Sequence, residues 1–142
     1  MAEEQAYRDL EIWRLGMDLV ERVYVATREF PKHETYGLSS QLRRAASSVP
    51  ANIAEGYGRG TRAALANSVR TARGSLAEVE TFLELACRLG YLSKDQLDEL
   101  NGLADSLGRK TYMFIKSLGQ PAVKETAAVY GELADELDLI NE

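Results

Sequence analysis

The 142-residue sequence predicts an all-α protein, an antiparallel up-down four-helix bundle with a short C-terminal helical extension. Apolar residues recur at alternating spacings of three and four over several long segments, which is the period of a helix that buries one face. No stretch alternates polar and apolar residues for long enough to predict a strand. We therefore expect the bundle over residues 1–120 and an acidic helical extension or tail over residues 121–142.

The first helix is expected from about Asp9 to Glu29, with one apolar stripe widened by a second set of apolar residues. Such a pattern is typical of a helix that packs against two neighbours. The stripe consists of Leu10, Trp13, Met17, Val20 and Tyr24, and the residues that widen it are Ile12, Leu19, Val23 and Ala26. The helix is expected to end at Phe30-Pro31, because proline disfavours helical geometry in the residue before it.

The second helix is expected to begin near Leu38 and is rich in small side chains, which permit the close approach of another helix. Pro50 lies inside it, and proline removes one backbone hydrogen bond and usually kinks a helix, so a bend is expected near residues 46–50. Gly56 follows, and glycine is favoured in the left-handed conformation that ends many helices. The sequence therefore predicts that the run GYGRG at residues 56–60 ends this helix, with Gly56 as its left-handed cap.

The third and fourth helices have the most regular pattern, with apolar residues that alternate spacings of four and three. In the short link between them, Gly90 is expected to end one helix, and Ser93 and Gln96 match a capping box at the start of the next. So short a link makes these two helices antiparallel neighbours. The apolar positions are Leu65, Val69, Ala72, Leu76, Val79, Leu83 and Ala86, then Leu97, Leu100, Ala104, Leu107, Thr111, Phe114 and Leu118.

A further amphipathic segment follows Pro121 and suggests a shorter fifth helix. Its apolar positions are Val123, Ala127, Tyr130, Ala134 and Leu137. Together with Ile12, Leu19 and Val23 in the first helix, this segment gives the chain more apolar surface than one bundle needs. We therefore expect a symmetric homo-oligomer.

Residues that could carry catalysis or bind a metal are scarce. The only cysteine, Cys87, lies in an apolar run where a buried thiol is expected, and the only histidine, His33, lies in a polar loop. A carboxylate-bridged metal pair in a helical bundle needs a Glu-x-x-His on each of two helices, which one histidine cannot provide. We therefore predict no catalytic residue, no metal site and no cofactor, and expect that the protein is not an enzyme.

The formal net charge of −5 conceals one basic stretch. Residues 36–75 carry six arginines against a single acidic residue, Glu55, which gives a local charge of +5. Because phosphate neutralisation supplies most sequence-independent affinity for nucleic acids, these arginines are candidate ligands of RNA or DNA. The candidates are Arg43, Arg44, Arg59, Arg62, Arg70 and Arg73. Alternatively, they pair with acidic residues of the first and fourth helices, or with a neighbouring subunit.

The sequence also bears on location. No apolar run reaches the roughly 20 residues that are needed to cross a bilayer. The chain begins with MAEEQ, which lacks the basic start and apolar stretch of a signal peptide. We therefore expect a cytoplasmic location and no membrane partner.

Several separated motifs resemble one protein family in their order and spacing. The most specific is SVPANIAEGYGR at residues 48–59, which follows QLRRAA at residues 41–46. The others are YRDL at 7–10, Trp13, FP at 30–31, YGL at 36–38, GSLAE at 74–78 and LGYL at 89–92. Over about residues 7–119 the sequence resembles the four-helix-bundle proteins of the 23S rRNA intervening-sequence type.

This resemblance implies a left-handed up-down bundle that assembles as a ring, typically a homopentamer. It also implies kinship with the accessory proteins of diversity-generating retroelements, which bind nucleic acid and a reverse transcriptase. The family has no defined biochemical activity, and the acidic tail falls outside its common pattern. Two functions therefore stay open: an oligomeric nucleic-acid-binding accessory protein, and a protein-interaction scaffold with no nucleic-acid contact.

Overall fold

The computed structural model of the protein describes the backbone of residues 3–119 and the side chains of residues 6–119. The long elements are four α-helices: α1 (Glu11–Thr27), α2 (Leu38–Gly58), α3 (Arg62–Arg88) and α4 (Lys94–Ser117). Two 3-10 helices, η1 (Glu3–Asp9) and η2 (Lys32–Glu34), precede α1 and α2. No strand occurs in this part of the chain. The prediction of an all-α protein with four long helices is confirmed, and the predicted fifth helix lies outside the described residues.

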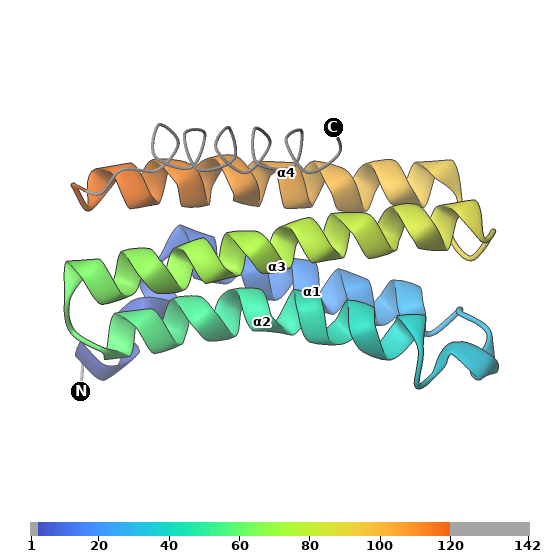
Figure 1. The fold of residues 1–142 in the computed structure, drawn as a ribbon, viewed down its shortest axis with the longest axis horizontal. Helices are drawn as coiled ribbons and strands as arrows, with labels where there is room; N and C mark the ends of the chain where they lie inside the picture. The colour runs from blue at the N-terminus through green and yellow to red at the C-terminus, as the bar shows by residue number, and fades with distance from the viewer. Residues whose placement is uncertain (1–2, 120–142) are drawn as a thin grey trace, which may run out of the picture.

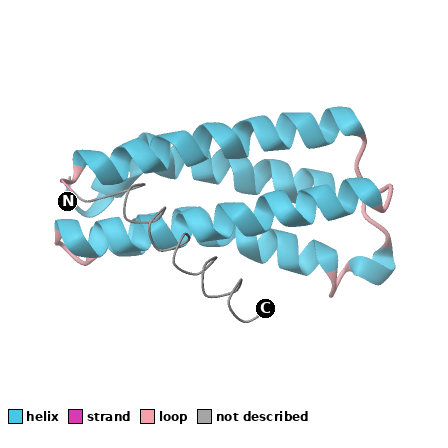
Figure 2. Cartoon of the chain, turned by 45° about the horizontal axis from the view of Figure 1, so that its top comes forward, coloured by secondary structure: helices cyan, strands magenta, loops and turns pink. Residues whose placement is uncertain are grey.

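The four helices run side by side, and successive helices run in opposite directions (Figures 1 and 2). Each helix contacts two others: α1 packs on α2 and α4, and α3 packs on α2 and α4. The core between them is built almost entirely of aliphatic side chains, of which Leu19, Leu42, Ile53, Leu83 and Leu107 are among the largest that are fully buried. This arrangement is the predicted up-down bundle.

The buried face of α1 is centred on the residues that were expected only to widen its apolar stripe. Ile12, Leu19 and Val23, which were expected to supply surplus apolar surface, are buried inside the protomer, whereas Met17 is 37% exposed. The reason is Gly16, which is also buried and lies against Pro50 of α2, where a Cβ on the glycine would be 3.3 Å from the Cβ of the proline. The surplus-surface argument based on these three side chains is therefore wrong.

A second close approach joins α2 and α3. Gly56 is buried within α2, which continues to Gly58, and a Cβ on Gly56 would lie only 2.4 Å from the Cβ of Ser68. The predicted cap at Gly56 is therefore wrong: the glycine serves helix packing, and the left-handed residue of this turn is Gly60, with φ of 82°. α2 also continues through Pro50, and its ribbon is bowed rather than broken (Figure 1).

The link between α3 and α4 matches the prediction. Gly90 has φ of 81°, as the left-handed residue that ends α3. The Ser93 hydroxyl accepts a hydrogen bond from the Gln96 backbone N–H at 3.1 Å, and the Gln96 side chain accepts one from the Ser93 N–H at 2.8 Å. This capping box satisfies two backbone donors at the start of α4 and fixes the direction in which that helix leaves the link.

Candidate nucleic-acid interface

The six candidate arginines lie in two groups. Arg59, Arg62, Arg70 and Arg73 surround the turn between α2 and α3 or follow it along α3. Arg43 and Arg44 lie on the first half of α2, toward the opposite end of the bundle (Figure 1). The basic stretch is therefore continuous in sequence but divided in space.

Arg43 makes contacts within the protomer. Its Nε donates a hydrogen bond to the Thr27 hydroxyl at 2.7 Å, and its guanidinium lies 4.6 Å from the centroid of the Tyr24 ring. Both partners belong to α1, so Arg43 joins the end of that helix to α2. Arg44, by contrast, is exposed and lines a surface hollow together with Tyr36.

Arg59 and Arg62 flank the turn between α2 and α3. Arg59 lies 2.6 Å from the Glu55 carboxylate one helical turn earlier, in a pair whose side chains are both more than half exposed. Such an exposed pair contributes little to stability, so Arg59 can exchange Glu55 for another anion at small cost. Arg62 occupies the first turn of α3 and is exposed, next to Thr61, whose hydroxyl accepts the Ala64 N–H at 3.1 Å.

Arg70 and Arg73 line a groove of about 500 Å³ between α3 and α4. Arg70 donates to the Asn67 side-chain oxygen at 2.8 Å, and the Arg73 guanidinium lies 5.7 Å from the ring centroid of Tyr112 on α4. The Nε of Arg73 is buried and has no hydrogen-bond partner within residues 6–119. The remaining groove residues are Gly74, Leu76, Ala77, Glu80 and Gly108.

Helices η1, α1 and α4 add further cations to the end of the bundle that holds Arg59 and Arg62. Because neighbouring helices are antiparallel, the second half of α4 and the first half of α1 lie at this end (Figure 1). A contact between Lys110 of α4 and Glu11 of α1 joins them there. The added cations are Arg8, Arg14, Arg109, Lys110 and Lys116. Sequence reasoning missed all five.

The bundle is therefore divided into two halves of opposite charge. We call residues 6–18, 49–75 and 106–119 the basic half and residues 19–48 and 76–105 the acidic half. The basic half carries nine basic and four acidic side chains, and the acidic half carries seven basic and ten acidic ones. Clustered charge of one sign raises the local concentration of oppositely charged ligands. The basic half is accordingly the surface best suited to bind a polyanion.

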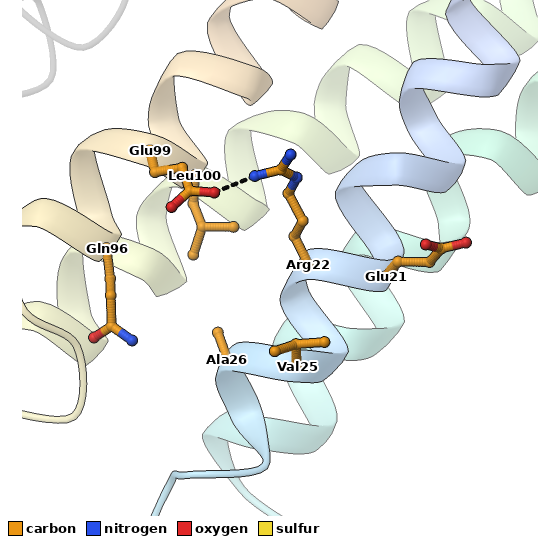
Figure 3. Close-up of a pocket in the computed structure, with 7 residues that line it drawn as sticks. All are labelled: Glu21, Arg22, Val25, Ala26, Gln96, Glu99 and Leu100. Atoms are coloured by element: carbon orange, nitrogen blue, oxygen red, sulfur yellow. Dashed lines mark hydrogen bonds and ion pairs between the residues drawn. The ribbon is translucent and has the colours of Figure 1, made fainter.

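In the acidic half, Arg22, Arg88 and Lys94 pair with nearby acids. Arg22 of α1 contacts Glu99 of α4 across the mouth of a hollow of about 350 Å³, which Val25 and Leu100 help to line (Figure 3). Lys94 likewise pairs with Asp98 at 2.5 Å. These pairs are exposed, as the Arg59–Glu55 pair is, so it is the surplus of acids in this half, not the pairing itself, that disfavours an external anion.

Groups that could bind a metal or act as nucleophiles are dispersed. Over residues 6–119, no cluster of three or more histidine, cysteine or acidic side chains could hold a metal ion. Cys87 is half-buried on α3. The His33 ring packs at 6.4 Å, centroid to centroid, on that of Tyr91, whose hydroxyl donates to Glu34 at 3.0 Å. None of the described helices is long and apolar enough to span a membrane.

The sequence matches a model of the 23S rRNA-intervening sequence protein family over residues 8–113. The chain belongs to this family. The resemblance predicted from the sequence motifs is therefore confirmed. The match includes all six candidate arginines together with Arg109 and Lys110, whereas Lys116 and residues 121–142 lie beyond it.

A solved structure confirms the fold of this family member. A protein of unknown function from the S23 ribosomal protein family of Bacteroides thetaiotaomicron VPI-5482 aligns with a TM-score of 0.68 at 23% sequence identity. The alignment covers 74% of this chain and 98% of the other. No curated protein matches the chain.

One carboxylate pair lies at the boundary between the two halves. Glu80 of α3 and Asp105 of α4 approach closely enough to share a hydrogen bond. Burial, and to a smaller extent the charge and hydrogen bond of Asp105, raise the pKa of Glu80 above its ordinary value. A raised carboxyl pKa means that the folded state binds the proton more tightly than the unfolded state does. The ionised pair therefore lowers stability as pH rises from about 4.5 through the raised pKa.

Glu80→Gln is expected to raise the free energy of unfolding at pH 7 and to leave it nearly unchanged at pH 4. The gain is expected to be below about 1 kcal/mol, because solvent screens a partly exposed pair. Urea denaturation at both pH values measures it, with Glu78→Gln, an exposed site on the same helix, as the control. A gain that is equal at both pH values would contradict the assigned cost of ionising Glu80.

Proposed function

We propose that the protein is a non-enzymatic, oligomeric nucleic-acid-binding protein that holds the phosphates of RNA or DNA on its basic half. The observation that carries this proposal is the charge separation along the bundle, with nine cations against four acids in the basic half. Arginine and lysine side chains that neutralise phosphates supply affinity without reading bases. The expected binding is therefore tolerant of sequence and sensitive to salt.

The overall acidity of the chain does not oppose this proposal, because it arises outside the bundle. Residues 6–119 carry sixteen basic and fourteen acidic side chains, although the formal net charge of the whole chain is −5. The excess acid belongs to Glu3, Glu4 and residues 121–142. A polyanion that approaches the basic half therefore meets a positive surface on a bundle that is itself slightly positive.

The spacing of the cations along α3 suits a nucleic-acid backbone. Arg62 and Arg73 are eleven residues apart on α3, which corresponds to about 17 Å along the helix axis. That length equals about five base steps of B-form DNA. Lys116 on α4 extends this surface, because its Nζ lies 5.8 Å from the ring centroid of Tyr112, on which Arg73 also packs, and Arg109 lines the neighbouring hollow between α4 and α1. Several phosphates can thus be contacted by one protomer.

Oligomerisation strengthens such weak contacts, because each added subunit brings its basic half to the same strand. A homo-oligomer, with five subunits expected from the family resemblance, is part of the proposal. Exposed apolar side chains on α1, including Met17, Tyr24 and Val25, offer contact surface. A reverse transcriptase is the protein partner that the resemblance suggests, and a cytoplasmic location is expected.

A protein-interaction scaffold without nucleic-acid contact is the second candidate. It is favoured by the same exposed apolar residues and by Tyr36, which is 97% exposed at the acidic end of the bundle. An exposed aromatic side chain is typical of a protein contact. Absence of nucleic-acid binding together with a stable oligomer would select this candidate.

Four of the five lysines test the proposal in the unmodified chain, because they are divided between the halves. Lys110 and Lys116 lie in the basic half, whereas Lys32 and Lys94 lie in the acidic half. Brief acetylation followed by mass spectrometry, with and without excess duplex DNA or RNA at low salt, measures the protection of each lysine. We expect protection of Lys110 and Lys116 only. Equal rates with and without nucleic acid at all four lysines would reject the proposal.

A further inference from the structure

The C-terminal segment, residues 121–142, is opposite in charge to the basic half. It carries six acidic side chains and one lysine, a net charge of −5, whereas the basic half has a net charge of +5. The segment also carries apolar residues such as Val123, Ala127 and Tyr130. The segment therefore carries both acidic and apolar side chains, which a groove with cations and an apolar floor would bind.

The segment also starts close to the basic half. α4 ends at Ser117, at the end of the bundle that holds Arg59 and Arg62 (Figure 1). Gly119 has φ of 75°, a left-handed conformation that turns the chain away from the helix axis. The 22 residues of the segment could span up to about 75 Å if extended, and α3 is about 40 Å long. Every cation of the basic half is within its reach.

The groove between α3 and α4 has the matching chemistry. Arg73 presents a buried Nε without a hydrogen-bond partner within residues 6–119, above the ring of Tyr112. Gly74 and Gly108 line the groove, and open space lies where a Cβ would project from either glycine. Glu80 lines the groove as well, so acidic side chains are favoured near Arg70 and Arg73 and disfavoured near Glu80.

We propose that residues 121–142 bind this groove of the basic half and compete there with nucleic acid. A tethered segment has an effective concentration in the millimolar range, so weak charge pairs suffice to hold it. Salt screens such pairs, so the bound fraction falls as ionic strength rises. The binding of the segment stands independently, and only the competition rests on the proposed function.

Trypsin detects the bound segment without any nucleic acid. Lys124 is the single basic residue among residues 121–142, so release of the fragment 125–142 reports cleavage at one site. Proteolysis follows the population of the open form when opening is fast. At low salt, we expect Arg70→Gln/Arg73→Gln to accelerate this cleavage at least roughly threefold, whereas Arg28→Gln/Arg88→Gln, which removes equal charge from the acidic half, leaves it unchanged.

Two checks accompany the cleavage assay. Circular dichroism must show equal helicity for both double variants, because Arg73 also packs on Tyr112. The rate constant for the wild-type chain must not change with protein concentration. Equal cleavage rates for the two double variants would overturn the proposal. Protection that grows with protein concentration would also overturn it, because the segment would then bind a separate molecule rather than its own.

The competition is tested by neutralising the segment in the full chain. The substitutions are Glu125→Gln, Glu132→Gln, Asp135→Asn, Glu136→Gln, Asp138→Asn and Glu142→Gln. The affinity for duplex DNA is expected to rise by the same factor by which the bound segment slows trypsin cleavage of the wild-type chain. The reason is that the apparent affinity is proportional to the fraction of molecules in which the groove is open. In the Arg70→Gln/Arg73→Gln background this gain is expected to vanish.

The outcomes separate the two claims. An equal gain in both backgrounds would show that the segment acts through net charge alone, which overturns binding to the groove. Protection from trypsin without nucleic-acid binding by any variant would overturn the competition and the proposed function and leave the bound segment in place.

Discussion

Leu83→Ala is expected to lower the free energy of unfolding by about 2–5 kcal/mol. Leu83 is fully buried on α3, within the core that all four helices share. Its truncation removes contacts and leaves a cavity that four packed helices cannot close. Chemical denaturation at a fixed protein concentration measures the change, since an oligomer makes stability depend on concentration.

The matched control is Leu85→Ala, two residues away on the same helix. Leu85 is 43% exposed, so its truncation is expected to change stability by at most about 0.5 kcal/mol. A large loss at Leu85 with a small one at Leu83 would mean that α3 is rotated about its axis. Similar losses at both sites would instead place Leu85 in an interface between subunits.

The parts of the fold that follow from local rules were predictable. α3 and α4 have regular apolar repeats, and the capping box at Ser93 and Gln96 needs only residues close in sequence. Gly90 ends α3 as predicted, because the left-handed conformation is the ordinary reason for a glycine at that position.

The two errors both concern glycines that allow helices to approach. Hydrophobic spacing gives no weight to Gly16, so the face of α1 that packs on Pro50 was not recognised as the buried one. Gly56 has the same role against Ser68, and its neighbourhood in sequence is indistinguishable from a helix end. Contacts between residues distant in sequence decide both positions, and a single sequence does not reveal such contacts.

The candidate site was only half predictable, for a geometric reason. Arg59, Arg62, Arg70 and Arg73 were found because they are close in sequence. The cations of α4 were missed because this helix carries most of its acidic residues in its first half and Arg109, Lys110 and Lys116 in its second half, whereas Arg8 and Arg14 are interspersed with Asp9 and Glu11. A charge sum taken over the whole helix averages its basic and acidic residues. A separate charge sum for each end of the bundle, with every second helix read in reverse, would have found the basic half.

The central claim is that nucleic acid binds the basic half, and two charge-matched triple variants test it most directly. Arg62→Gln/Arg109→Gln/Lys116→Gln removes three exposed cations from the basic half, and Arg28→Gln/Lys32→Gln/Arg44→Gln removes three from the acidic half. Both variants lose the same net charge. Equal helicity and equal mass by light scattering establish that any lost binding is not caused by lost structure or lost subunits.

The measurement is the slope of log affinity against log salt concentration for duplex DNA. Each phosphate contact contributes about −0.9, so the basic-half variant is expected to have a slope about 2.7 less negative than that of the wild-type chain. The acidic-half variant is expected to keep the wild-type slope. Equal slopes for the two variants, or a loss confined to the acidic-half variant, would contradict the account.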